Sequence, residues 1–244
     1  MESLIIISAG LFILAILSGM LGLGVAFAAI PFLSFFYADL VHEVQPLSLL
    51  LNGVTATFAA WGFARSKLVD WKTALPLLAV ATLCAPLGGA AAQIISQTAI
   101  WIMYFVAVLY LAYRLFKPAR QGCGTPKFKL TLALAIPISI LSSLLGVGPG
   151  FLLLPTMILL CYEPKHAAAI TAVVVTLPSF SALIPHLSTA KIDLNATLVL
   201  VAVGAVGSFL GARITSLWVP GKRLKQMFGI LIVLMSAYKL YTLL

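Results

Sequence analysis

The stretch SSLLGVGPGFLLLP, residues 142–155, places three glycines and a proline within five positions, in the middle of a long apolar run. A glycine inside a helix costs about 1 kcal/mol relative to alanine, and an interior proline about 3 kcal/mol. The apolar run, 129–161, would be ~50 Å long as one helix, whereas the hydrocarbon core of a bilayer is ~30 Å thick. We therefore expect a broken helix: two short helices joined at the glycines.

Composition places the whole chain in a membrane. Of its 244 residues, 62% are hydrophobic and only 9% are charged, whereas a soluble domain is about one quarter charged. Apolar runs of about 20 residues favour transmembrane helices over the alternating strands of a barrel. The net charge of +9 lies in the loops, which indicates orientation in a lipid bilayer rather than a nucleic-acid partner. The sequence predicts an all-α integral membrane protein.

The chain divides into eight apolar segments and one polar linker. The linker, 117–128, separates a first repeat, 1–116, from a second, 129–244. Each repeat is expected to contain a broken helix followed by three transmembrane helices. The broken helices are 4–37 and 129–161, and the other helices are 44–64, 72–95, 98–116, 166–189, 194–217 and 224–243.

The two halves resemble each other in sequence. ILSGMLGLGVAFAAIP, 16–31, and ILSSLLGVGPGFLLLP, 140–155, are identical at eight of sixteen positions, with an offset of 124 residues. The same offset pairs His42 with His166. Such an ordered set of matches predicts an internal duplication, as in many transporters.

Loop charges indicate that the repeats are inverted. The loop 65–72 and the linker are basic, so both are expected in the cytoplasm. In the second half the basic loop is 213–225, whereas its first-half counterpart, 93–100, has no charge. All the basic loops lie on one side only if each broken helix is a hairpin, which leaves both termini outside. A parallel arrangement of eight simple spans remains the alternative.

The broken helices predict a binding site for a small anion. A helix that starts inside the membrane exposes unpaired backbone N–H groups and the positive end of its dipole, an arrangement that suits an anion in a polar cavity. If the repeats are inverted, both starts converge near the midplane. The alternative is that these glycines serve only close helix packing. The candidate residues are Gly22, Leu23, Gly24 and Val25 in the first break, and Gly146, Val147, Gly148, Pro149 and Gly150 in the second.

Polar side chains follow on the next helix of each half. Asn52 and Thr55 match Thr176 and Ser179 at the offset of 124, and residues three apart lie near one face of a helix. Amide and hydroxyl groups can donate to an oxyanion without burying a full charge. We expect these four residues to contact the substrate, the alternative being hydrogen bonds between helices.

His186 is the candidate for proton coupling, because histidine titrates near neutral pH. The alternative is an interfacial histidine with a structural hydrogen bond. All six acidic residues lie in loops or near helix ends, which argues against a cation pump with carboxylates inside the membrane. No HExxH motif or paired aspartates are present, so we expect no enzyme activity, no metal and no cofactor.

The runs GVGPGFLLLP, 146–155, and HLSTAKIDLN, 186–195, resemble the TauE/SafE family of membrane transporters, whose motif is a glycine-rich run followed by a proline in each half. The resemblance implies a multi-pass protein of the bacterial inner membrane that exports sulfite or a small organosulfonate such as sulfoacetate, with protons as a possible coupling ion. This chain departs from the family pattern in places. Pro149 replaces a glycine, Val25 and Ala26 replace two more, and AITAV, 169–173, stands where the family often has GTSL.

Two other functions stay open from sequence: an anion channel that uses the same pocket, and a membrane scaffold or assembly factor without a ligand.

Overall fold

The computed structural model describes residues 2–116, 125–191 and 193–220. These residues contain helices and no strand, so the expected all-α class is confirmed. The α-helices are α1 (Glu2–Leu21), α2 (Ala26–Leu33), α3 (Gln45–Arg65), α4 (Trp71–Ala92), α5 (Gln97–Phe116), α6 (Phe128–Leu144), α7 (Gly150–Leu159), α8 (Pro164–Leu183) and α9 (Leu194–Trp218); η1 (Leu40–Val44) is a π-helix and η2 (Ile184–His186) a 3₁₀ turn.

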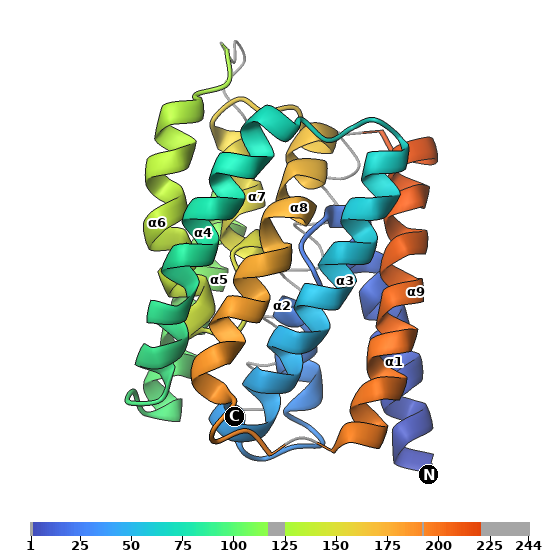
Figure 1. Ribbon diagram of the computed structural model, residues 1–244, viewed down its shortest axis with the longest axis vertical. Helices are drawn as coiled ribbons and strands as arrows, with labels where there is room; N and C mark the ends of the chain where they lie inside the picture. Colours follow the sequence, from blue (N-terminus) through green and yellow to red (C-terminus); the bar gives the residue numbers. More distant parts are fainter. Residues whose placement is uncertain (1, 117–124, 192, 221–244) are drawn as a thin grey trace.

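Both long apolar segments are broken at their glycines, as expected. α1 stops at Leu21 and α2 begins at Ala26, while α6 stops at Leu144 and α7 begins at Gly150. In Figure 1, α1 and α3 begin at the same end of the molecule, and α6 and α8 both begin at the opposite end. Each pair of half-helices thus leaves one end, turns inside the molecule and returns.

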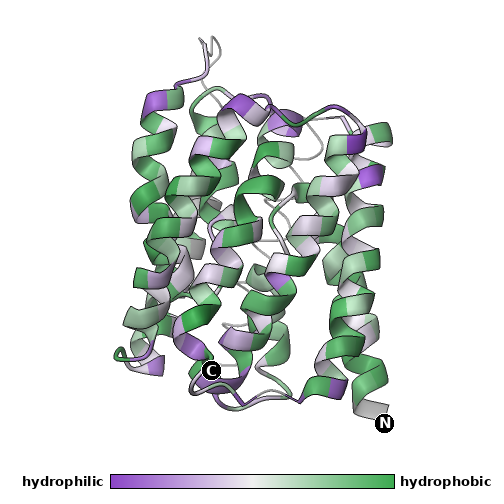
Figure 2. Ribbon diagram, viewed as in Figure 1, coloured by the Kyte–Doolittle hydropathy of each residue, from purple (hydrophilic) through white to green (hydrophobic). Residues whose placement is uncertain are grey.

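The outer surface is suited to lipid. Five helices or helix pairs are long and apolar enough to cross a membrane: Leu4–Leu21, Leu40–Arg65, Trp71–Ala92, Pro164–His186 and Leu194–Trp218. Large apolar side chains such as Leu83 and Ile94 are 78% and 86% exposed. Figure 2 shows hydrophobic residues along the length of the helices and hydrophilic residues gathered at the two ends. A band of this kind is what a bilayer covers.

Close helix contacts join the two halves of the chain. α1 packs on α9, where a Cβ at Gly211 would collide with the carbonyl group of Ile16. α4 packs on α6, where a Cβ at Gly88 would collide with the carbonyl group of Ile140. Ile16 and Ile140 are 124 residues apart and the two glycines 123, so the two contacts match at the repeat offset with a slip of one residue. This reciprocity agrees with the duplication, although the division into two inverted repeats stays a prediction.

The basic loops lie together. The loop after α3, the start of α6 and the end of α9 share one end of the molecule in Figure 1, and Nη1 of Arg213 donates to Oγ of Ser66 at 3.0 Å. This is the arrangement that the hairpin interpretation required. The positive-inside rule predicts that this end faces the cytoplasm.

The helix bounds differ from the expected ones mainly before α3 and after α8. The π-helix η1 precedes α3, with Asp39 as its N-cap. The expected helix 166–189 ends as an α-helix at Leu183, and Pro185 stands in the 3₁₀ turn that follows. The expected helix 224–243 lies outside the described residues.

Candidate functional site

Both breaks begin with the same helix-ending turn. In the first, Gly22 is left-handed, with a φ of +66°. Its N–H donates to the carbonyl oxygen of Gly19 at 3.2 Å, and the N–H of Leu23 donates to that of Ser18, also at 3.2 Å. These two bonds define a Schellman motif, which satisfies the last carbonyl groups of a helix. The second break has the same two bonds at the offset of 124 residues.

A second left-handed glycine then turns the chain into the next half-helix. Gly24 and Gly148 have φ values of +70° and +69°. A residue with a Cβ would be strained by about 1–2 kcal/mol in this left-handed conformation. At both positions an added Cβ would also collide with the side-chain amide of Asn52. The glycines are therefore required both by the backbone and by the close approach of Asn52.

The start of α2 is capped by side chains of α3. The N–H of Val25 donates to Oγ1 of Thr55 at 3.2 Å, and the N–H of Ala26 donates to Oδ1 of Asn52 at 2.9 Å. The hydroxyl group of Thr55 in turn donates a hydrogen bond to the carbonyl oxygen of Leu51 at 2.8 Å. Two of the N–H groups that a helix start leaves unpaired are thus satisfied.

Asn52 also reaches the second break and α8. Its Nδ2 donates to Oγ of Ser179 at 2.9 Å and lies 3.4 Å from the carbonyl oxygen of Val147. Asn52, Thr55 and Ser179 are all fully buried. The structure therefore brings three of the four expected polar residues together between the two breaks.

Thr176 behaves differently. It is half-buried, and its Oγ1 donates to the carbonyl oxygen of Val173, within its own helix, at 2.7 Å. Thr57 is exposed and also bonds within its own helix, whereas Ser181 donates to the carbonyl oxygen of Thr82 on α4. Ser181 thus forms the interhelical kind of bond that was the alternative for these polar residues.

The two breaks touch each other. A Cβ at Gly150 would lie 2.7 Å from the carbonyl oxygen of Leu23 and 2.5 Å from Cγ2 of Val175. Residues 21–30 and 142–155 are buried throughout. The starts of α2 and α7 therefore meet in the interior of the protein, away from lipid.

The electrostatics of this region favour an anion. Among the side chains that the structure describes, no lysine, arginine, aspartate or glutamate is fully buried. Each helix start carries roughly half a positive elementary charge, and the negative ends of α1 and α6 are satisfied by the Schellman turns. The described ranges contain no group of three or more histidine, cysteine, aspartate or glutamate residues that could hold a metal ion.

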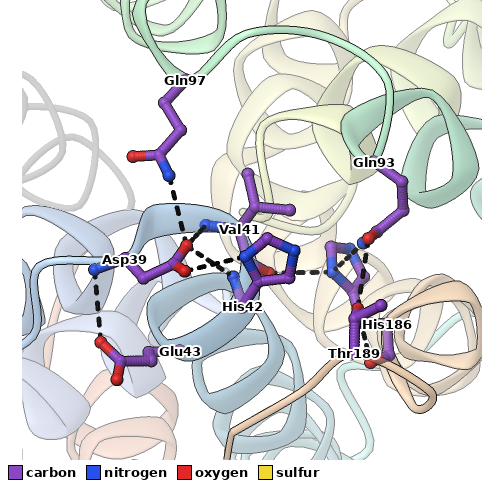
Figure 3. Close-up of polar contacts among 8 residues, drawn as sticks. All are labelled: Asp39, Val41, His42, Glu43, Gln93, Gln97, His186 and Thr189. Carbon is purple, nitrogen blue, oxygen red and sulfur yellow. Dashed lines mark hydrogen bonds and ion pairs between the residues drawn. The ribbon is translucent and has the colours of Figure 1, made fainter.

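His186 lies in η2 and contacts Val41 of η1, so it stands at the end of the molecule where α3 begins and not beside the breaks. Figure 3 shows its polar neighbours. It is fully buried, and its Nδ1 lies 2.7 Å from Nε2 of Gln93 and 3.2 Å from the carbonyl oxygen of Val41. Its Nε2 is buried with no hydrogen-bond partner in the described structure. Thr189 completes this cluster by donating to Oε1 of Gln93 at 3.2 Å.

The π-helix makes the carbonyl group of Val41 available to His186. The N–H of Gln45 donates to the carbonyl oxygen of Leu40, as π-helical spacing requires, so it does not serve Val41. Pro46, the next residue, has no N–H to offer. The carbonyl oxygen of Val41 is thus left for a side chain of the other half of the sequence.

Asp39 secures the same turn. Its Oδ1 accepts from the N–H groups of Val41 and His42, at 3.2 and 3.1 Å, and from Nε2 of Gln97 at 3.2 Å, while its Oδ2 lies 2.8 Å from Nδ1 of His42. Partial burial raises the pKa of Asp39, but the hydrogen bonds from His42 and Val41 and the nearby His42 ring outweigh it. The pKa therefore lies below its ordinary value.

Sequence reasoning missed Gln45 and Ser48 on α3. Both are fully buried. Nε2 of Gln45 donates to the carbonyl oxygen of Leu144 at 3.2 Å, and its side chain packs where Gly146 lacks one. Positions 45, 48, 52 and 55 recur at helical spacing, which places four polar side chains on one face of an apolar helix. That periodicity was the signal that could have identified them.

Comparison with known proteins gives one family. The family model described as "Sulfite exporter TauE/SafE" matches residues 6–239. The chain is also similar to "Probable membrane transporter protein YunE" of Bacillus subtilis (strain 168), with 23% identity over 273 aligned residues that cover 99% of this chain and 98% of that protein. No solved structure matches.

Proposed function

Because the chain belongs to the TauE/SafE family of membrane transporters, we propose that it is a secondary transporter of a small sulfur-containing anion: sulfite, or an organosulfonate such as sulfoacetate. It is a multi-pass membrane transporter of the bacterial inner-membrane type and not an enzyme. The substrate, the direction of export and proton coupling are parts of the proposal, and the name of the family supports the first two.

One observation carries the choice of an anion: the starts of two half-helices meet in a buried, uncharged region. The residues around them offer backbone N–H groups, an amide and hydroxyls, and no acidic side chain. Fixed dipoles of this kind act strongly on an anion where water is excluded. The three oxygens of a sulfite or sulfonate head group can accept from several such donors at once.

The transport step is alternating access around this site. The breaks contact α3 through Asn52, and Asn52 contacts α8 through Ser179. Movement of one set of helices past the other would open the site to each side in turn. His186 is the residue that we propose takes up the coupled proton, because its Nε2 is unpaired and a buried charge there would favour a conformation in which water reaches the ring.

The test is flux in proteoliposomes loaded with sulfite, sulfoacetate or a control anion such as acetate, with and without a pH gradient. We expect saturable export of a sulfur oxyanion that the gradient stimulates, and loss of the stimulation in His186→Asn. Flux far above carrier turnover, without dependence on the gradient, would instead support an anion channel. No flux for any sulfur oxyanion would overturn the proposal.

A further inference from the structure

The two half-helix starts are not equivalent. At the start of α2, the N–H groups of Val25 and Ala26 are both bonded to side chains of α3. At the start of α7, Gly150, Phe151 and Leu152 have backbone N–H groups for which the described structure contains no acceptor. All three residues are buried. Unpaired buried N–H groups are rare in proteins because each costs free energy comparable to a lost hydrogen bond.

Two substitutions between the halves explain this difference. The counterpart of Val25 is Pro149, which has no N–H and so needs no acceptor. The counterpart of Asn52 is Thr176, whose side chain is shorter by one heavy atom and bonds to the carbonyl oxygen of Val173 instead. Ser179, the counterpart of Thr55, is occupied as the acceptor for Asn52. The second half therefore lacks the internal caps that the first half has.

A second observation points to the same place. Oγ of Ser48 is fully buried and has no hydrogen-bond partner in the part of the chain that the structure describes. Ser48 lies on α3 between Gln45, which contacts Gly146, and Asn52, which contacts Val147 and Gly148. Since these positions share one helix face, Ser48 stands on the face of α3 that packs against the second break.

The direction of α7 fits this placement. The N–H groups in the first turn of a helix point out of its N-terminal end. α7 runs toward the end of the molecule where α8 begins, so its free N–H groups point toward the end where α3 begins. Gln45 and Ser48 lie in the first turns of α3, on that side.

From these observations we infer that the transported anion binds at the start of α7 alone, on the N–H groups of Gly150, Phe151 and Leu152 and the hydroxyl group of Ser48. Asn52 and Thr55 are internal caps that hold α2 and keep the first start closed to the ligand. This inference rests on the proposed function. It differs from a site shared equally by both breaks, because it assigns the ligand to one of two similar helix starts.

The test gives the second half the cap that it lacks. Thr176→Asn places an amide where Asn52 stands in the first half, so its oxygen can accept from the start of α7. The expected result is a rise in Tm without ligand, together with at least a tenfold loss of the stabilisation and flux that sulfite or sulfoacetate produces. Thr57→Asn is the matched control, because Thr57 is exposed and bonds within its own helix; its Tm and anion response should equal those of the wild type.

A second variant tests the side-chain donor. Ser48→Ala removes one hydrogen bond to a charged ligand, which corresponds to about a tenfold loss of affinity, with little change in Tm because the hydroxyl has no partner in the absence of ligand. Unchanged anion responses in Thr176→Asn, or wild-type affinity in Ser48→Ala, would overturn the inference while leaving the proposed function intact. If the wild type itself responds to neither anion, the proposed function fails.

Discussion

Phe27 and Phe151 stack on each other, with ring centroids 5.8 Å apart and ring planes inclined by 14°. The two residues are 124 positions apart, so they are counterparts in the two halves of the sequence. If a two-fold axis relates the two halves, as the predicted inverted repeat requires, residues that pack on their own counterparts lie close to that axis. The stack therefore marks the centre of the arrangement that brings α2 and α7 together.

The contributions of Phe27 and Phe151 to the free energy of unfolding should depend on each other. Stacked rings contribute about 0.5–1.5 kcal/mol beyond the area that they bury. In a double-mutant cycle, Phe27→Leu and Phe151→Leu should show a coupling energy of that size, measured by reversible unfolding in detergent. Phe151→Leu combined with Phe209→Leu, on α9, is the control and should be additive. Additivity of the Phe27 and Phe151 changes would contradict the stacked geometry.

The left-handed glycines should be intolerant of alanine. Gly24→Ala and Gly148→Ala combine the left-handed strain of about 1–2 kcal/mol with a collision against Asn52. We expect each to lower the free energy of unfolding by 2 kcal/mol or more, roughly, since both penalties act together. Gly204→Ala, where the added Cβ meets one methyl group of Thr55 at 3.0 Å, is the control and should be much milder. Equal effects at all three positions would argue against special turns at the breaks.

Loss of the Asn52 side chain should cost more than loss of its partner on α8. Asn52→Ala leaves the N–H of Ala26 buried without an acceptor, at about 1–3 kcal/mol. Ser179→Ala removes one acceptor of the Asn52 amide, which retains its second contact, the carbonyl oxygen of Val147. We expect the larger fall in Tm for Asn52→Ala. The reverse order would show that the bond to α8, and not the cap on α2, is the stabilising contact.

Labelling from outside the cell tests the orientation. In a chain whose three cysteines are replaced, single cysteines would be introduced at Lys67 and at Ser96. Lys67 stands in the loop between α3 and α4 and Ser96 in the loop between α4 and α5, and these two loops lie at opposite ends of the molecule in Figure 1. Because positive residues favour the cytoplasm, a membrane-impermeant thiol reagent should label position 96 and not position 67 in intact cells. Labelling of position 67 alone would show that the protein has the opposite orientation in the membrane.

The ionised side chain of Asp39 should make a small contribution to the free energy of unfolding, and this contribution should be lost in acid. Its pKa is lowered in the folded protein, so the stabilisation is complete above the ordinary value of 3.8 and is lost as the pH falls through the folded value. Asp39→Asn retains a capping oxygen but removes the charge. Since Asp39 is partly exposed, the advantage of the wild type should be below about 1 kcal/mol near pH 6 and should vanish near pH 2. An advantage that persists at pH 2 would rule out the charge as its source.

The broken helices were predictable because glycine and proline limit the backbone locally. A run of more than 30 apolar residues with GVGPG at its centre cannot cross a bilayer once as a straight helix. The position of Asn52 and Thr55 on one helix face was also predictable, since they stand three residues apart. Their capping of α2 was not predicted, and the substrate contact expected of them stays a prediction. These features depend on short stretches of sequence and on the thickness of the bilayer.

The inequality of the two helix starts was not predictable from the repeat. The offset of 124 residues pairs Asn52 with Thr176, which suggested equal roles for the two side chains. The side chain of Thr176 is shorter by one heavy atom, and this difference decides whether a side chain reaches a backbone N–H group of the half-helix. Gln45 and Ser48 were overlooked because they stand near a helix end, where polar residues usually face water. Only the packing of the second break against α3 buries them.

The outer tip of each break rests on the first turns of a helix from the other half: Gly22 against the carbonyl group of Ala168, and Gly146 against Gln45. Ala168 is four residues, or about 6 Å of helix, past the start of α8, and Gln45 is the first residue of α3, so each tip lies within about one turn of the start of a long helix. We therefore expect that small tilts of α3 or α8 would be enough to admit solvent to either tip, without separating the long contacts of α1 with α9 and of α4 with α6.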